Sequence, residues 1–195
     1  RGTLFPYTTL FRSKHSIEKQ TAHHVDCFTT VSDITAKECQ ELLDKSVDVI
    51  LPNGFEDDFV PKGAKFTAKR SAARKKLLSV ANTLTGSDIA ADALIISTSG
   101  RYEFRNKGID VFIEAINRLR FDDRLNKQVV AFIEVPGWLA GPRQDLAERI
   151  ASGEHFDSPL EMPMLTHWLH NMDNDNVLSM MRSLGMNNAK GDKVK

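Results

Sequence analysis

The sequence lacks the features that mark several large classes of protein. Only two cysteines occur among its 195 residues, Cys27 and Cys39. Two cysteines are too few for a disulfide scaffold and their spacing fits no zinc pattern, so we expect both to be reduced, as in a cytoplasmic protein. No apolar run approaches the ~18 residues that a membrane-spanning helix requires. The sequence therefore predicts no membrane partner.

An excess of charge of one sign is also missing. Lysine and arginine together number 26, as do aspartate and glutamate, so the formal net charge at pH 7 is zero. Surfaces that bind nucleic acid usually carry a broad positive patch, so this balance argues against a nucleic-acid partner. It still permits a small local site for an anion.

The first half of the chain alternates between helical and strand patterns. Residues 16–26 and 34–45 have apolar residues at helical spacing, and Ser32 precedes the second of these helices as an N-cap. Residues 27–31 and 47–51 are β-branched and aromatic, which is typical of short strands. Such alternation favours parallel α/β packing. Residues 1–13 differ in character, and we interpret them as a foreign or disordered leader.

After a turn at Pro52-Asn53-Gly54, the acidic segment 55–63 indicates a linker. Beyond it we expect a helix at 66–84, a buried strand at 93–98, an amphipathic helix at 108–120 and a buried strand at 129–135. Residues 142–152 predict a short helix with Pro142 near its first turn. One or two helices are expected in 164–184, with a break at 173–176. The polar end, 187–195, stops where another strand could begin.

The segment most informative about chemistry is 99–108, with the sequence SGRYEFRNKG, between a predicted strand and a predicted helix. Ligands of parallel α/β sheets bind beyond the carboxyl ends of strands, and a helix N-terminus attracts anions. Gly100 and Gly108 permit tight turns and a close approach of the backbone. Arg101 offers a planar fork and Lys107 a point charge for phosphate oxygens. On the residues alone, a solvated charged loop is an equally good interpretation.

Three stretches together resemble one enzyme family. STSGRYEFRNKGIDVFIEAINRL, IEKQTAHHVDCFTTVSDITAKECQELL and VDVILPNGF are similar, in the right order, to glycogen synthases of the animal and fungal type and their bacterial relatives. The resemblance covers most of residues 14–135. It implies an α/β fold of Rossmann-like parallel sheet units, from a glycosyltransferase with two Rossmann-like domains.

The resemblance also implies an activity. The family transfers glucose from a nucleotide donor, usually UDP-glucose, to the non-reducing end of an α-1,4-glucan such as glycogen, with retention and without a metal or other cofactor. Arg101 and Lys107 match the family residues that contact the donor diphosphate. Arg105 lies between them at a position where charge varies, and we assign it no contact.

The resemblance further implies that the sequence is an internal fragment. Residues 14–52 correspond to the end of the N-terminal domain and 53–195 to the start of the nucleotide-binding C-terminal domain, with Asn53 and Gly54 as the interdomain hinge. We expect Gly54 to take a backbone conformation closed to other residues. The family's glycine-rich donor loop and its Glu-x7-Glu pair are absent here, so we expect no catalytic residue in this chain and no activity from it alone. A homo-oligomer is left open.

Other interpretations remain beside this one. His167, His170 and Asp173 would share a face if they lay on one helix and could then bind a metal, although exposed helix positions are the more common role. His23 is more readily explained by packing than by catalysis. The whole chain could instead be a non-catalytic module that binds a nucleotide, a sugar or a protein.

Overall fold

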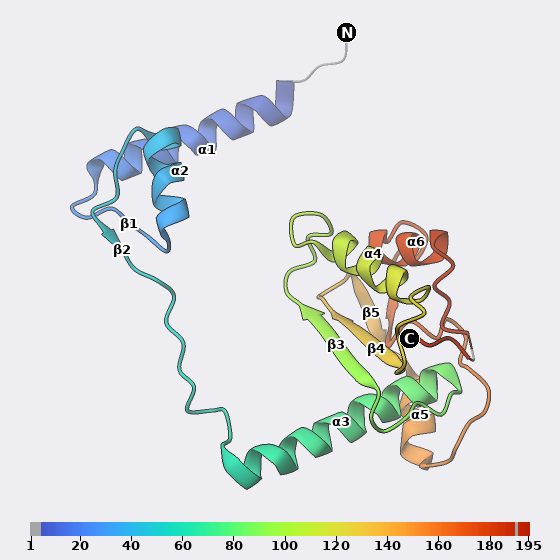
Figure 1. Cartoon of the computed structure of the whole chain (residues 1–195). Coiled ribbons are helices and arrows are strands. Elements are labelled where there is room, and N and C mark those ends of the chain that lie inside the picture. Colours follow the sequence, from blue (N-terminus) through green and yellow to red (C-terminus); the bar gives the residue numbers. More distant parts are fainter. Residues whose placement is uncertain (1–4, 190) are drawn as a thin grey trace. The chain divides into compact units, whose positions relative to one another are not determined.

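The computed structural model describes the backbone of residues 5–189 and 191–195, and side chains from residue 12 onward. Within it the chain forms two compact units, Arg1–Val60 and Pro61–Lys195, which are treated separately (Figure 1). The division falls inside the acidic segment 55–63. Residues 51–62 contain neither helix nor strand, so the two units are joined by an irregular segment.

The first unit contains two helices and two short strands: α1 (Phe5–His24), β1 (Thr29–Thr30), α2 (Asp33–Leu43) and β2 (Val49–Ile50). β1 and β2 pair in parallel, as the alternating pattern predicts. Both strands are shorter than expected, because within the described residues each pairs only with the other, over two residues. Of the expected foreign or disordered leader, residues 5–13 belong to helix α1, so disorder is wrong for them, whereas a foreign origin stays a prediction. Residues 1–4 lie outside the described part.

Polar side chains fix both ends of α2. Its first turn is capped by Ser32, whose hydroxyl accepts a hydrogen bond from the N–H of Thr35 at 3.2 Å, as predicted. At its other end, the Nε2 of His15 donates to the carbonyl of Leu42 at 2.7 Å, and the Nε2 of His23 donates to that of Leu43 at 3.0 Å. Lys19 forms an ion pair with Asp44. The two histidines and the lysine lie at successive turns of α1. His23 is exposed and bonds to the backbone of α2, which agrees with the expected packing or surface role.

The second unit begins with a long helix and contains two further sheets (Figure 1). Its elements are α3 (Gly63–Thr85), β3 (Leu94–Ser99), α4 (Ile109–Leu119), β4 (Val129–Glu134), β5 (Leu139–Pro142), α5 (Gln144–Ser152), β6 (His167–Leu169) and α6 (Asn176–Ser183). β3 and β4 pair in parallel, in register from Leu94 opposite Val129 to Ser99 opposite Glu134. The strand–helix–strand unit is thus the parallel α/β arrangement that the sequence predicts.

Alternate residues of this sheet face opposite helices. On one face, Val130 and Ile95 pack with Leu78 and Ala81 of α3. On the other face, side chains of β3 and β4 pack with α4: Ile96, Val129 and Ala131 against Phe112, Ile116 and Leu119. Since cross-strand partners such as Ile95 and Val130 lie on the same face, both helices bury a continuous apolar layer. The core of the unit lies in these two layers.

Two local expectations are wrong. β3 is only half-buried, since β4 is its only strand partner among the described residues. Pro142 ends strand β5 rather than starting a helix, and α5 begins at Gln144. Residues 164–184 contain one helix, α6, within the expected one or two, and the strand β6 at 167–169, which pairs antiparallel with β5, was not expected.

Arg143 connects these irregular parts from a buried position, with only 1% of its surface exposed. Its guanidinium donates to both carboxylate oxygens of Asp145, at 3.0 and 2.5 Å, and to the carbonyls of Met162 and Leu165, at 3.0 and 3.2 Å. It also lies 4.3 Å from the ring centre of Trp168. The hydrogen bond from Arg143 lowers the pKa of Asp145 below its usual value. A single cation therefore joins the start of α5 to the segment that leads into β6.

The end of the chain adds backbone pairing to the sheet. Val194 lies parallel to Val129 of β4, and hydrogen bonds of 2.8 Å join residues 193–195 to Val129 and Ala131. This contact is an isolated bridge rather than a strand. In the described part of the chain, no helix is both long and apolar enough to cross a bilayer.

Replacing Arg143 by alanine should destabilise the protein by about 3 kcal/mol, because the partly buried carbonyls of Met162 and Leu165 lose their donor at ~1–3 kcal/mol each. Urea unfolding followed by circular dichroism measures this loss. The control is Arg124→Ala, since that side chain is 91% exposed and, among the residues that the structure describes, forms an ion pair only with Asp122. Its effect should stay within about 0.5 kcal/mol. Equal losses for the two variants would contradict the role given to Arg143.

Candidate functional site

The loop 99–108 leaves the carboxyl end of β3 and leads into α4 as a series of tight turns. Its first residues stay attached to the sheet, since the N–H of Gly100 donates to the carbonyl of Glu134 at 3.4 Å. Further on, the N–H groups of Lys107 and Ile109 donate to the carbonyls of Glu103 and Phe104, at 2.9 and 3.0 Å. The loop backbone is therefore ordered by its own hydrogen bonds and lies where ligands of parallel sheets bind.

Two glycines at the ends of the loop have backbone conformations that other residues rarely adopt. Gly100 has a φ of 146° and Gly108, the N-cap of α4, a φ of 65°. This confirms the expected tight turns. The corresponding expectation for Gly54 is wrong, because its φ is not positive and it lies in the irregular segment that joins the two units.

The N-terminus of α4 is not a free anion site. The N–H groups of Ile109 and Asp110 both donate to the carbonyl of Phe104, and that of Val111 donates to the carboxylate of Asp110 at 2.9 Å. The expectation that helix N–H groups would hold the anion is therefore wrong, since the first three already have acceptors. Any anion at this loop must be held mainly by side chains.

Arg101 and Lys107 are both available for such a role. The Arg101 side chain is 74% exposed, and its Nη1 lies 3.0 Å from the Oε1 of Glu103. Lys107 is exposed and its side chain has no polar partner in the part of the chain that the structure describes. An exposed ion pair contributes little stability, so an incoming phosphate can compete with Glu103 for Arg101. Arg105, between them, is also exposed.

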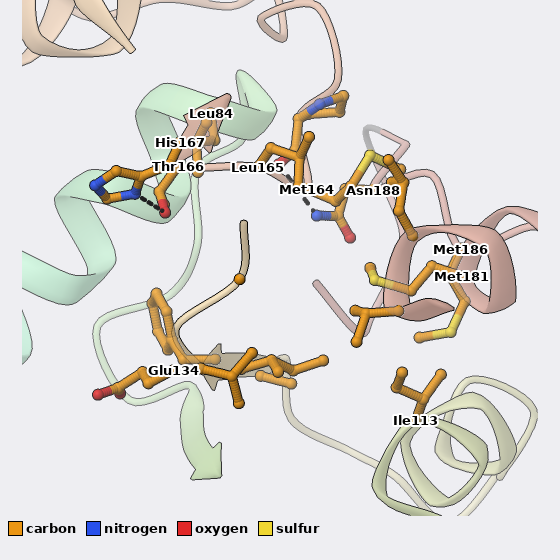
Figure 2. Close-up of a pocket in the computed structure, with 18 of the residues that line it drawn as sticks. Leu84, Ile113, Glu134, Met164, Leu165, Thr166, His167, Met181, Met186 and Asn188 are labelled. Carbon is orange, nitrogen blue, oxygen red and sulfur yellow. Dashed lines mark hydrogen bonds between the residues drawn. The ribbon is translucent and has the colours of Figure 1, made fainter. Parts of the chain in front are cut away.

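A cavity of about 440 Å³ lies along β4, between α3 and α4, and is closed by residues 163–167, β5, β6 and α6. Its lining is mostly apolar. Figure 2 shows sulfur atoms of Met181 and Met186 within this lining, whereas the carboxylate of Glu134 points away from them. Arg101 and Lys107 do not line the cavity. Diphosphate needs cations and hydrogen-bond donors. Lys195 is the one lysine or arginine in this lining and its Nζ already donates to the carbonyl of Ala189, so the cavity is not the candidate anion site.

One loop residue, Tyr102, reaches this cavity wall. Its Oη donates to Oδ2 of Asp175 at 2.5 Å and accepts from the N–H of Val177 at 3.2 Å. Asp175 caps α6 at the same time, since its Oδ1 accepts from the N–H of Leu178 at 2.9 Å. Two effects raise the pKa of Tyr102 to about 12: burial of the hydroxyl, which is the larger, and its hydrogen bond to Asp175.

Both partners of this contact were missed by reasoning from the sequence. The signal for Asp175 was present, because an aspartate directly before Val177 and Leu178 is typical of an N-cap. Nothing in the sequence pairs it with Tyr102, which lies 73 residues earlier.

The other candidate residues are not brought together. His167 lies in β6, His170 packs against the ring of Trp138, and Asp173 lies 3.9 Å from Arg182. These three residues therefore do not share a helix face, which the metal site would require. Among the described residues, no group of three or more His, Cys, Asp or Glu side chains could hold a metal ion.

Comparison with known proteins gives a consistent result. The family model described as glycogen synthase matches residues 10–140. The chain is 39% identical over 132 residues to glycogen [starch] synthase isoform 2 of Saccharomyces cerevisiae, and 38% identical over 136 residues to glycogen [starch] synthase of Dictyostelium discoideum. The liver glycogen [starch] synthase of Mus musculus is 31% identical over 129 residues.

These relatives are much longer than the chain. Each alignment covers 63% of this chain, but only 18% of the yeast and mouse proteins and 15% of the Dictyostelium protein. The matched region includes the whole 99–108 loop, because the family model extends from residue 10 to residue 140.

The Tyr102 environment predicts a pH dependence. Its pKa is higher in the folded state, about 12 against 10.0, so the folded protein holds the proton more tightly. The contribution of this bound proton to the free energy of unfolding is complete below pH ~10 and is lost as the pH rises through about 12. In a Tyr7→Phe background Tyr102 is the single tyrosine, and its ultraviolet titration should centre near pH 12. A midpoint near 10 in protein still folded by circular dichroism would contradict the buried hydrogen bond.

Proposed function

Because the chain belongs to the glycogen synthase family, we propose that it is the central part of a retaining glucosyltransferase. In this proposal, residues 14–52 are the end of the N-terminal Rossmann-like domain and 53–195 the start of the C-terminal one, with Asn53 and Gly54 as the hinge. The donor is a nucleotide sugar, UDP-glucose, and the acceptor is the non-reducing end of an α-1,4-glucan such as glycogen. The reaction takes place in the cytoplasm.

The observation that carries the proposal is the exposure of Arg101 and Lys107 on one ordered loop at the carboxyl end of β3. Arg101 and Lys107 bring two cations to the loop, and its single acid, Glu103, is already paired with Arg101. A diphosphate has the opposite charge, and guanidinium and ammonium groups are the side chains that bind it most strongly. The family match over the same residues supports this assignment.

The chemical role follows from where charge develops. When the bond between the anomeric carbon and the diphosphate oxygen breaks, both bonding electrons remain on the leaving UDP. Arg101 and Lys107 would stabilise this negative charge electrostatically, with no cofactor assigned. Gly100 and Gly108, which lack a Cβ, would let the loop backbone lie close to the phosphates. No atom lies within 4 Å of the position that a Cβ would take at either glycine. The space next to both glycines is therefore open.

Arg101→Ala and Lys107→Ala should each weaken binding of UDP by ~1.5–3 kcal/mol, because each removes one charge-assisted contact. Titration by NMR or calorimetry measures the change in affinity. Arg101→Lys should recover part of the loss, since it keeps the charge but not the planar fork. The matched control is Arg105→Ala on the same loop, which should leave the affinity nearly unchanged. Unaltered affinity in both alanine variants would refute the assignment.

The purified 195-residue chain should transfer no measurable glucose from UDP-glucose to glycogen, because the sequence contains no Glu-x7-Glu pair. Incorporation of labelled glucose into glycogen measures this activity. The yeast isoform 2 enzyme, assayed in parallel, shows that donor and acceptor are competent. The contradicting result would be glucose transfer by the chain that disappears when Arg101 is replaced by alanine. It would mean that the groups needed for transfer lie within these 195 residues.

A further inference from the structure

Tyr102 connects the proposed phosphate loop to a distant helix. It follows Arg101 directly in the chain, yet its hydroxyl contacts the N-terminus of α6 through Asp175 and Val177. A carboxylate can only accept a hydrogen bond and a backbone N–H can only donate one. The hydroxyl proton therefore points to Asp175, and an oxygen lone pair points to Val177. Both capacities of the hydroxyl are used, so its orientation is fixed.

The same contact completes the N-terminus of α6. Among its first N–H groups, that of Leu178 is bound by Asp175 and that of Val177 by Tyr102. The first N–H groups of a helix have no partner within the helix. Tyr102 thus supplies a capping acceptor to a helix whose residues lie more than 70 positions away.

This contact also holds the loop on its second side. On the first side, the N–H of Gly100 attaches the loop to Glu134 at the end of β4. Arg101 lies between these two attachments, and its side chain is left exposed. Without the Tyr102 hydroxyl, this segment would keep its bond to Glu134 and the hydrogen bonds within the loop, but would lose its attachment to α6.

We propose that Tyr102 and Asp175 are positioning residues for the donor diphosphate: their hydrogen bond holds the loop of Arg101 and Lys107 in its binding conformation and couples donor binding to α6. The inference rests on the proposed function of the loop. Neither residue touches the phosphates in this arrangement. They act by raising the fraction of molecules in which the loop is ready to bind, and apparent affinity falls in proportion to that fraction.

Two variants separate positioning from simple stability. Tyr102→Phe removes the hydroxyl and keeps the ring in the cavity wall. Asp175→Asn keeps a carbonyl oxygen that can cap Leu178, because asparagine caps as well as aspartate, but it offers an amide N–H₂ group where Tyr102 needs an acceptor. Each variant should weaken UDP binding to the folded chain about fivefold, and the double variant should lose little more than either one, since both break the same contact.

Loop order is measured without ligand by hydrogen exchange of the Lys107, Gly108 and Ile109 amides, which are bonded within the loop. Both variants should speed this exchange. The control is Thr85→Val, which removes a buried hydroxyl bonded to the carbonyl of Ala81 at 2.8 Å. It should lower stability while leaving UDP affinity and loop exchange unchanged.

The outcomes distinguish this inference from the proposed function. If Arg101→Ala and Lys107→Ala weaken UDP binding while Tyr102→Phe and Asp175→Asn change neither affinity nor exchange, the positioning role is refuted and the phosphate assignment stands. If the alanine variants have no effect on UDP binding, the proposed function fails and the positioning role fails with it, even where loop exchange speeds up. Weaker UDP binding together with faster exchange in both positioning variants supports the inference.

Discussion

The parallel pairing of β3 and β4 is the constraint on which the second unit depends. Two parallel strands need a crossover connection, and α4 supplies it. Their carboxyl ends then meet at one edge of the sheet, which brings Gly100 to Glu134. The loop 99–108 starts from that edge, so its position follows from the register of the strands. α3 and α4 can bury the two faces because side chains alternate along both strands.

Elements with strong periodicity could be predicted from the sequence. α4 has apolar residues at helical spacing and a glycine before its first turn, and the structure places it at Ile109–Leu119. The Ser32 cap likewise depends on residues within one turn of each other. β5 and β6 could not be predicted, because they pair residues that lie more than twenty positions apart, and Arg143, directly after β5, bonds to the segment that leads into β6. That side chain finds its acceptors on Met162 and Leu165, about twenty positions later, and local patterns carry no information about such contacts.

The candidate site shows the same division between local and distant information. The charges of Arg101 and Lys107 and the turn at Gly108 are visible in ten consecutive residues. The state of the α4 N–H groups was predicted wrongly, because Phe104 and Asp110 already bind them, and only the folded loop shows this. The role of Tyr102 depends on Asp175, far along the chain. The sequence therefore indicates which charges the loop carries, whereas the structure shows which backbone groups remain for a ligand and what holds the loop.

The shared cap of α6 has a consequence for the order in which the chain folds. α6 has eight residues, Asn176–Ser183, and a helix of this length is marginal in water on its own. One of the two side chains that accept from its first N–H groups, Tyr102, belongs to a loop whose position follows from the pairing of β3 with β4. Helix α6 should therefore be a late element of folding, and most mutations within it should speed unfolding more than they slow folding.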